Sequence, residues 1–314
     1  MRNALFLYLQ SLIEERRGSR LLSRCWGCWV RGRNFLYDRA LLPIRRAPVP
    51  VVSVGNIVAG GTGKTPLVHL IARTLAPHVP LAILTRGYRG GDEARLLARR
   101  LPTVPIYVGK RRIDSARRAA AEGAKLLLLD DGFQHRKLAR DIDCLLLHAD
   151  DLKRENYYLP RGSLRDSPER IAQATQIFIY PSEPQLLERF PNAIGLGLKV
   201  KGFFAKKVAL FAGIARPARF VRTVREQGME VVAQCPLADH EPIGEERLAR
   251  FAKEARKAGA EALLCTEKDW VKLALDRNRG FALPVHYLEM ELEVVAGQAH
   301  WDSFIEQIRK KVDN

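Results

Sequence analysis

A glycine-rich segment between an apolar run and a helical pattern constrains this chain more than any other feature. Residues 51–55 are typical of a buried strand, and residues 55–66 continue as Gly-Asn-Ile-Val-Ala-Gly-Gly-Thr-Gly-Lys-Thr-Pro. Free backbone N–H groups, a lysine and a hydroxyl at the start of a helix together bind a nucleoside triphosphate with Mg²⁺. The segment therefore predicts a P-loop, with phosphate contacts from Val58, Ala59, Gly60, Gly61, Thr62, Gly63, Lys64 and Thr65.

The P-loop pattern usually begins with a glycine at the position that Val58 occupies here. Gly60 and Gly61 are expected to supply the backbone freedom that this glycine ordinarily gives.

Apolar runs alternate with helical patterns along the rest of the chain. Continuous apolar runs between helices are typical of a parallel sheet covered on both faces. The runs predict strands at 51–54, 81–84, 106–108, 126–129, 143–147 and 176–180, with helices at 67–75, 95–100 and 113–122. A second unit follows, with strands at 208–211, 230–233 and 262–265 and helices at 215–227 and 245–258. The predicted fold is an α/β, P-loop NTPase-like parallel sheet sandwich with a second, smaller α/β domain.

Two segments of alternating polarity, 194–200 and 285–292, leave and re-enter this pattern. One leaves the first unit and the other returns to it, which predicts a two-stranded ribbon joining the domains. The expected boundaries are 1–193 for the first domain, 194–204 and 284–295 for the ribbon, and 205–283 for the smaller domain. The last helix, within 296–314, is expected to pack on the first domain.

Two carboxylates, Asp130 and Asp131, follow the apolar run 126–129. In a P-loop fold this position places an acid beside the Thr65 hydroxyl, where it orients Mg²⁺ and its waters.

Polar residues also follow other predicted strands, at 85–89, at 91–93 and at Asp239-His240. Ligands of open α/β sheets bind outside the carboxyl ends of the strands, so these residues indicate a cleft. The loop 159–166, Leu-Pro-Arg-Gly-Ser-Leu-Arg-Asp, adds two guanidiniums and a carboxylate suited to phosphate or metal contact.

The charge of the chain points to a polyanionic partner. Lys and Arg total 52 against 35 Asp and Glu, a formal net charge of +17. The N-terminal stretch places apolar residues at helical spacing among arginines. These residues are Leu5, Leu9, Leu12, Ile13, Leu22, Trp26 and Trp29, interleaved with Arg16, Arg17, Arg20, Arg24, Arg31 and Arg33. Such a helix lies on an anionic membrane or packs in the core as a first helix, and both interpretations stay open.

Neither a membrane span nor a secreted, disulfide-bonded protein is favoured. No run of about 18 apolar residues exists. A signal peptide is disfavoured because Gln10 and Ser11 interrupt the first apolar run. Five cysteines, an odd number, favour a reducing cytosolic compartment, and Cys25-x-x-Cys28 lacks a second pair at zinc spacing.

Taken together, GNxxxGGTGKTP, TRGY, GDE, LDDGFQHRKLxRD, LPRGxLR[DE], the Asp-His pair and TEKDxVKL resemble the tetraacyldisaccharide 4'-kinase family over nearly the whole chain. The resemblance implies a peripheral protein on the cytoplasmic face of the inner membrane. It implies transfer of the ATP γ-phosphate to the 4'-hydroxyl of a tetraacylated disaccharide 1-phosphate in lipid A biosynthesis, with ATP and Mg²⁺ as cofactors.

The resemblance also implies roles for individual residues. Lys64 and Thr65 would hold phosphate and Mg²⁺, and Asp92 with His240 would form the catalytic pair. Basic contacts to the nucleotide would come from Arg86, Arg112 and Arg165, and the metal-side positions from Asp130, Asp131, Gln134 and Asp166. Because Asp92 and His240 belong to different predicted domains, we expect the pair to assemble when the domains close about the ribbon.

Three other classes of P-loop protein compete with a kinase. A P-loop GTPase or metallochaperone-like NTPase is the main alternative, although Thr266-Glu267-Lys268-Asp269 has the wrong spacing for the guanine-selecting N-K-x-D. A nucleic-acid-dependent ATPase fits the charge but lacks a nucleic-acid-binding signature, so no nucleic-acid partner is expected. A regulatory nucleotide-binding protein without catalysis is disfavoured by the acidic and basic residues that follow several strands.

Overall fold

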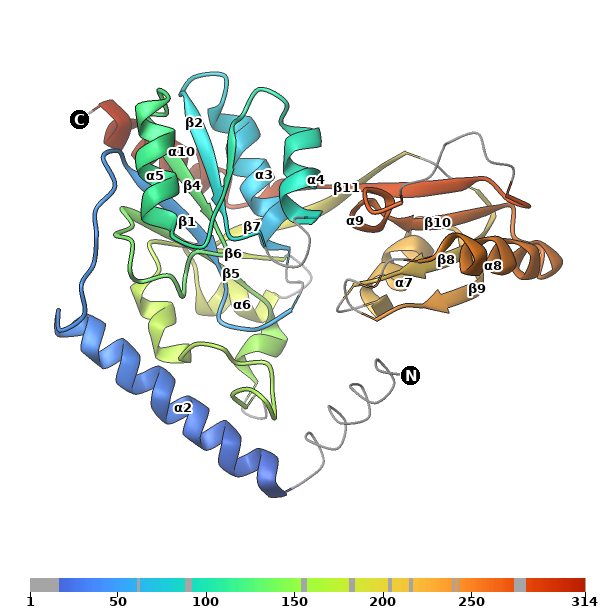
Figure 1. Ribbon diagram of the computed structural model, residues 1–314, viewed down its shortest axis with the longest axis horizontal. Coiled ribbons are helices and arrows are strands. Elements are labelled where there is room, and N and C mark those ends of the chain that lie inside the picture. The colour runs from blue at the N-terminus through green and yellow to red at the C-terminus, as the bar shows by residue number, and fades with distance from the viewer. Residues whose placement is uncertain are drawn as a thin grey trace. The chain divides into compact units, whose positions relative to one another are not determined.

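The computed structural model describes residues 17–60, 63–87, 92–153, 157–180, 184–202, 205–214, 217–238, 241, 243–273 and 281–313 (Figure 1). The helices are α2 (Arg17–Asp38), α3 (Lys64–Leu75), α4 (Asp92–Arg100), α5 (Arg112–Ala121), α6 (Pro184–Arg189), α7 (Pro217–Glu226), α8 (Glu245–Lys257), α9 (Glu267–Trp270) and α10 (Gln298–Asp313), with short 3-10 helices η2 (Ala149–Leu152) and η3 (Pro168–Gln173). None of these described helices is long and apolar enough to cross a bilayer.

The strands are β1 (Val51–Gly55), β2 (Leu81–Thr85), β3 (Ile106–Val108), β4 (Leu126–Asp130), β5 (Ile142–Leu147), β6 (Gln176–Ile179), β7 (Ile194–Gly202), β8 (Lys207–Ala212), β9 (Glu230–Pro236), β10 (Ala262–Thr266) and β11 (Val285–Ala296). The chain divides into two compact units. The first comprises Met1–Gly87, Leu97–Gly197 and Leu292–Asn314, and the second comprises Tyr88–Leu96 and Leu198–Glu291.

The sheet of the first unit runs in the order β3-β2-β4-β1-β5-β6-β7. Its recorded pairings are parallel, with β1 between β4 and β5. Parallel neighbours place their carboxyl ends at one edge of the sheet. The β1 end that leads into the P-loop therefore lies beside the β4 end that carries Asp130. The predicted parallel α/β architecture is confirmed.

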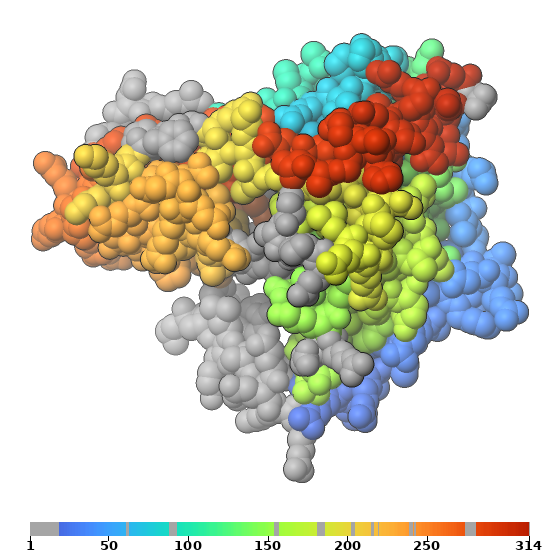
Figure 2. All heavy atoms as spheres, turned by 180° about the vertical axis from the view of Figure 1, so that it is seen from behind, coloured from blue at the N-terminus to red at the C-terminus, as the bar shows by residue number. Residues whose placement is uncertain are grey.

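Both faces of this sheet are covered, because successive strand residues point to opposite sides. In β2 and β4 the residues that pack with α3 and α10 alternate with residues that pack with α5. Trp301, Phe304, Ile305 and Ile308 of α10 are buried in the same cluster as Leu67 and Ile71 of α3. Figure 2 shows α10 (red) lying next to α3 (cyan) on the surface of this unit.

The second unit is a smaller sheet in the order β11-β10-β8-β9, with parallel pairings throughout. Phe220 and Val224 of α7 pack on one side of it, and Leu248 and Phe251 of α8 on the other. β8, β9 and β10 are each followed by a helix that leads to the next strand, as in other parallel sheets.

Asp269, in the segment 266–269 that resembles a displaced guanine motif, has a structural role in this second unit. Its Oδ2 accepts hydrogen bonds from the Gly213 N–H at 3.1 Å and the Thr266 hydroxyl at 2.6 Å. Lys272 Nζ lies 3.1 Å from its Oδ1. Thr266 caps α9 by accepting from the Asp269 N–H, and the Asp269 carboxylate ties this helix to the turn after β8.

β7 and β11 run from one unit into the other and also extend the sheets. Within the first unit β7 pairs with β6, and within the second β11 pairs with β10. A Cβ on Gly195 would lie 2.7 Å from the Ala296 Cβ, so glycine permits the close approach of the two strands there.

Candidate functional site

The P-loop of this chain leaves a fully buried strand and enters a helix whose first turn is free of acidic residues. Gly63 has φ 91°, in the left-handed region that favours glycine, and it precedes Lys64 at the start of α3. A Cβ there would also lie 2.6 Å from the Tyr180 hydroxyl. No side chain caps this helix, so its first backbone N–H groups and its dipole favour an anion.

The described part of the P-loop backbone is bonded to the loop 163–166. Ala59 N–H donates to the Ser163 carbonyl at 2.7 Å. The Ile57 carbonyl accepts from the Arg165 N–H at 2.9 Å and from the Asp166 N–H at 3.2 Å. The loop 159–166, predicted from its charges, therefore lies directly against the entry of the P-loop.

Two cations and one carboxylate meet beside the P-loop. Lys64 Nζ lies 3.4 Å from Asp131 Oδ1, and Arg165 donates through both terminal nitrogens to the same carboxylate. Arg165 also donates to the Asn56 side chain. Burial alone would raise the pKa of Asp131, but the charges of Lys64 and Arg165 hold it well below its usual range. Both cations are thus preplaced where a polyphosphate would bind.

The donor set at the end of β4 fits a magnesium ion. Thr65 Oγ1 lies 3.5 Å from Asp130 Oδ2, and the Asp130 carboxylate is buried. Mg²⁺ prefers hard oxygen ligands, takes few from the protein and keeps several waters. Among the described residues there is no group of three or more His, Cys, Asp or Glu side chains suited to a metal.

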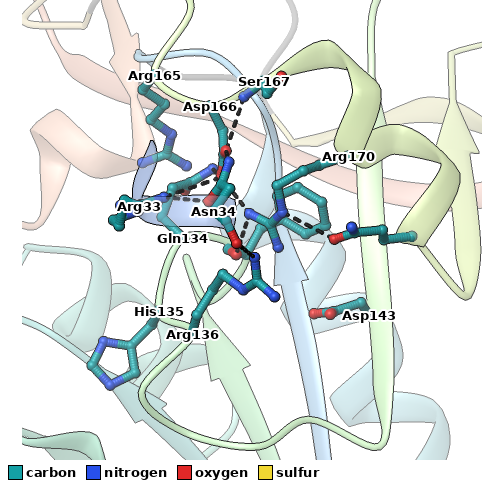
Figure 3. Close-up of polar contacts among 12 residues, drawn as sticks. Arg33, Asn34, Gln134, His135, Arg136, Asp143, Arg165, Asp166, Ser167 and Arg170 are labelled. Carbon is teal, nitrogen blue, oxygen red and sulfur yellow. Dashed lines mark hydrogen bonds and ion pairs between the residues drawn. The ribbon is translucent and has the colours of Figure 1, made fainter. Parts of the chain in front are cut away.

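Asp166, predicted on the metal side, already accepts several hydrogen bonds (Figure 3). Its Oδ1 accepts from Asn34 Nδ2 at 2.8 Å and from the Ser167 N–H at 2.9 Å. Its Oδ2 accepts from Gln134 Nε2 at 3.3 Å and from Arg170 Nη1. The carboxylate is fully buried. A metal bond from Asp166 would have to displace one of these donors, so its metal role stays a prediction.

His135 lies near several cations. Burial, followed by the charges of Arg112 and Arg140, lowers its pKa from 6.5 to about 4, so the imidazole is neutral at neutral pH. Arg112 is buried at the start of α5, where its Nη1 donates to the Gly109 carbonyl at 2.6 Å. Arg86 follows β2 and contributes to the same positive field.

Replacing His135 with Gln should make the protein less sensitive to acid. The folded pKa is about 4 and the ordinary value is 6.5, so between these pH values the unfolded chain binds a proton that the folded chain does not. The contribution of neutral His135 to the free energy of unfolding is therefore fully present above pH 6.5 and is lost as the pH falls toward 4. Urea titrations at several pH values should show the variant gaining on the wild type by up to about 1.4 kcal/mol per pH unit in that window. An exposed-site control is His78→Gln, and a difference independent of pH would contradict the prediction.

The chain matches the family described as tetraacyldisaccharide-1-P 4'-kinase (LpxK) over residues 19–311. The chain belongs to this family. A tetraacyldisaccharide 4'-kinase of Anaeromyxobacter dehalogenans (strain 2CP-C) is 36% identical, over 83% of this chain and 82% of that protein. One of Syntrophus aciditrophicus (strain SB) is 34% identical, over 83% of this chain and 85% of that protein.

A solved structure shares the fold. The crystal structure of LpxK from Aquifex aeolicus in complex with ATP superposes with a TM-score of 0.72 at 27% identity, covering 93% of this chain and 99% of that one. The sequence resemblance to the tetraacyldisaccharide 4'-kinase family is thus confirmed at the level of family and fold.

Several site residues predicted for this family member lie outside the described residues. They are Gly61, Thr62, Asp239, His240 and the side chain of Asp92. Lys64, Thr65, Asp130, Asp131, Gln134 and Arg165 are brought together around the P-loop. Sequence reasoning missed Asn34 and Arg170. Asn34 lies 132 residues from its partner Asp166, and Arg170, four residues after Asp166, carries no signature that marks it as a partner of this carboxylate.

Proposed function

We propose that this chain transfers the γ-phosphate of ATP to the 4'-hydroxyl of a tetraacylated disaccharide 1-phosphate, a step in lipid A biosynthesis. The observation that carries the proposal is the convergence of Lys64, Arg165 and the α3 N-terminus on one point beside two carboxylates. Family membership names the acceptor, because the relatives are tetraacyldisaccharide 4'-kinases.

Phosphoryl transfer depends mainly on positioning and on neutralising charge at the phosphate oxygens. Lys64 and Arg165 supply positive charge, and the P-loop N–H groups orient the phosphates. Asp131 pairs with both cations, whose charges lower its pKa and keep the carboxylate ionised. Bound ATP, more highly charged than one carboxylate, would draw the cations toward its phosphates.

Thr65 and Asp130 would hold Mg²⁺, with Asp131 as the nearest further carboxylate. The ion would neutralise charge between the β- and γ-phosphates. Gln134 and Asp166 are proposed for the metal side as well, and the Gln134 side chain donates to the Asn56 carbonyl at 2.7 Å.

A sugar hydroxyl is a weak nucleophile and needs a base. Asp92, supported by His240, is the proposed base, which would contribute about 10²- to 10⁴-fold to the rate. The segment Tyr88–Leu96, which includes Asp92, clusters with the second unit, as does Leu198–Glu291, so the expected placement of the pair in different domains is not met. We further propose that closure about β7 and β11 brings the pair to the P-loop, which would exclude water and limit ATP hydrolysis.

The deciding experiment is a kinase assay. Purified protein is incubated with γ-labelled ATP, Mg²⁺ and the tetraacylated disaccharide 1-phosphate, and the expected product is a labelled bisphosphorylated lipid. GTP in place of ATP tests the alternative NTPase function. Turnover of either nucleotide without transfer to the lipid would overturn the proposal.

We also propose that α2 docks the protein on the anionic cytoplasmic face of the inner membrane. Its buried stripe consists of Ser19, Ser23, Gly27, Val30, Asn34 and Tyr37. The opposite face exposes large apolar side chains. Their exposed fractions are Leu21 64%, Leu22 56%, Trp26 39%, Trp29 54%, Phe35 53% and Leu36 38%. Arg20, Arg24 and Arg31 are exposed on the same helix, in reach of lipid phosphates.

Replacing Trp26 and Trp29 with Ser should detach the protein from anionic vesicles and leave its melting temperature nearly unchanged. Both rings are exposed, so the burial that is lost lies against lipid and not in the core. Rising salt should weaken the binding of the wild type in vesicle sedimentation. Each cation near the surface contributes about 1 kcal/mol, and dissolved ions screen this attraction.

A matched control replaces two exposed apolar side chains elsewhere, Val108 (55%) and Val295 (50%), with Ser. This control should sediment as the wild type does. Equal loss of binding in the control, or a several-degree drop in melting temperature for the tryptophan variant, would contradict docking through α2.

A further inference from the structure

Buried polar side chains connect the inward face of α2 to the P-loop. Asn34 donates to the fully buried Asp166 carboxylate, and the backbone N–H of Asp166 donates to the Ile57 carbonyl at the P-loop entry. Gln134 gives a second route, since its Nε2 donates both to Asp166 Oδ2 and to the Asn56 carbonyl. Figure 3 shows Asn34 pointing into this group from α2.

The loop that follows β4 is tied to the same turn of α2. Arg136 Nη1 donates to the Asn34 carbonyl at 3.0 Å, and Arg136 Nη2 donates to Asp38 Oδ1 at 2.7 Å. This loop begins with Asp131, so a carboxylate of the phosphate site and an α2 contact lie five residues apart in one short segment.

The N-terminal half of α2 contacts the other loop of the site. Ser23 Oγ donates to the Tyr158 carbonyl at 2.6 Å. A Cβ on Gly27 would lie 2.7 Å from the Tyr158 ring, so helix and ring are in direct contact. Tyr158 precedes the segment 163–166 that bonds to the P-loop backbone.

We propose that Asn34 is a positioning residue that couples lipid docking of α2 to nucleotide binding at the P-loop. The proposal rests on the proposed docking of α2 on lipid. Buried polar networks are costly to leave unsatisfied, so a shift of α2 against the bilayer moves the bonded loops and does not break their hydrogen bonds. Lipid on the outward face thereby selects one arrangement of residues 56–59, 131 and 163–166.

Such coupling is reciprocal. The probe pair is anionic vesicles of phosphatidylglycerol and phosphatidylethanolamine, and a non-hydrolysable ATP analogue with Mg²⁺, both added to the full chain. Vesicles should tighten binding of the analogue by about 5-fold or more, and the analogue should tighten vesicle binding by the same factor. Asn34→Ala should bring both factors below about 2-fold while keeping its vesicle affinity in the absence of the analogue.

The matched control on the same helix is Gly32→Ala, because a Cβ there meets open space. This control should keep full coupling. Full coupling in Asn34→Ala, or wild-type vesicle binding without coupling, overturns the inference and leaves docking itself standing. Absence of wild-type vesicle binding overturns docking and this inference together.

A second measurement does not depend on the variant folding. Hydrogen exchange of the wild type should slow at the amides of 56–59 and 163–166 when vesicles are added. Exchange there that is unchanged by bound vesicles overturns the coupling.

Discussion

Lys64→Ala should lower kcat for lipid phosphorylation by about 10²- to 10³-fold, the usual loss when one preorganised charge-stabilising contact is removed. The ammonium is preplaced 3.4 Å from Asp131 and is only 13% exposed, so solvent screens it weakly. Arg165 still pairs with Asp131 in the variant, so the carboxylate stays neutralised and the fold should hold. The measurements are steady-state kinetics with labelled ATP and a thermal melt.

A matched control is Lys125→Ala, an exposed lysine before β4 and outside the site. It removes the same charge and should leave kcat unchanged. If Lys64→Ala retained kcat within about threefold of wild type, the P-loop lysine would not stabilise the transferring phosphate, and the assignment of this loop would fail.

The parallel sheet was predictable because its strands are buried on both faces. Runs such as 126–129 need no alternation when α3 and α10 cover one side and α5 the other. The glycine-rich turn into α3 was predictable for a related reason. The left-handed backbone at Gly63 and the close approach of Tyr180 there tolerate few other residues.

The orientation of α2 could not be predicted, because helical periodicity marks two faces without saying which is buried. The usual rule buries the apolar face. Here the buried stripe mixes Ser19, Ser23, Gly27 and Asn34 with Val30 and Tyr37, because the loops beneath it present carbonyls, a buried carboxylate and a guanidinium. Trp26 and Trp29 are exposed, so the alternative of a core helix is wrong for these two rings.

The partners of Asp166 were equally hidden from the sequence. Asn34 lies 132 residues away, and Arg170 returns to the carboxylate only because η3 turns the chain back after Ser167. In sequence, a charged loop in a P-loop protein looks like a set of metal ligands. The sequence does not show which groups its carboxylate contacts in the fold. Contacts between distant polar residues leave no periodic pattern from which to infer them.

Asp166→Ala should lower the free energy of unfolding by about 3–5 kcal/mol, the usual cost of leaving a buried charge without its partner. Arg170 is 3% exposed as a residue, and burial lowers its pKa while the charge of Asp166 opposes that shift. Without the carboxylate, the guanidinium keeps two acceptors among the described residues, the Phe133 carbonyl at 3.2 Å and Gln173 Oε1 at 3.2 Å. Asn34 and Gln134 lose an acceptor as well. Urea unfolding of both proteins at neutral pH measures the difference.

The double variant Asp166→Ala/Arg170→Met separates charge from cavity. If the uncompensated guanidinium dominates, the second change should recover part of the stability, which gives a coupling free energy between the two sites. The same proteins decide what Asp166 does. A metal ligand would lose turnover on replacement with little change in stability, whereas the buried ion pair with Arg170 predicts instability first. An Asp166→Ala protein as stable as the wild type but unable to transfer phosphate would contradict the structural role and favour Asp166 as a ligand of Mg²⁺.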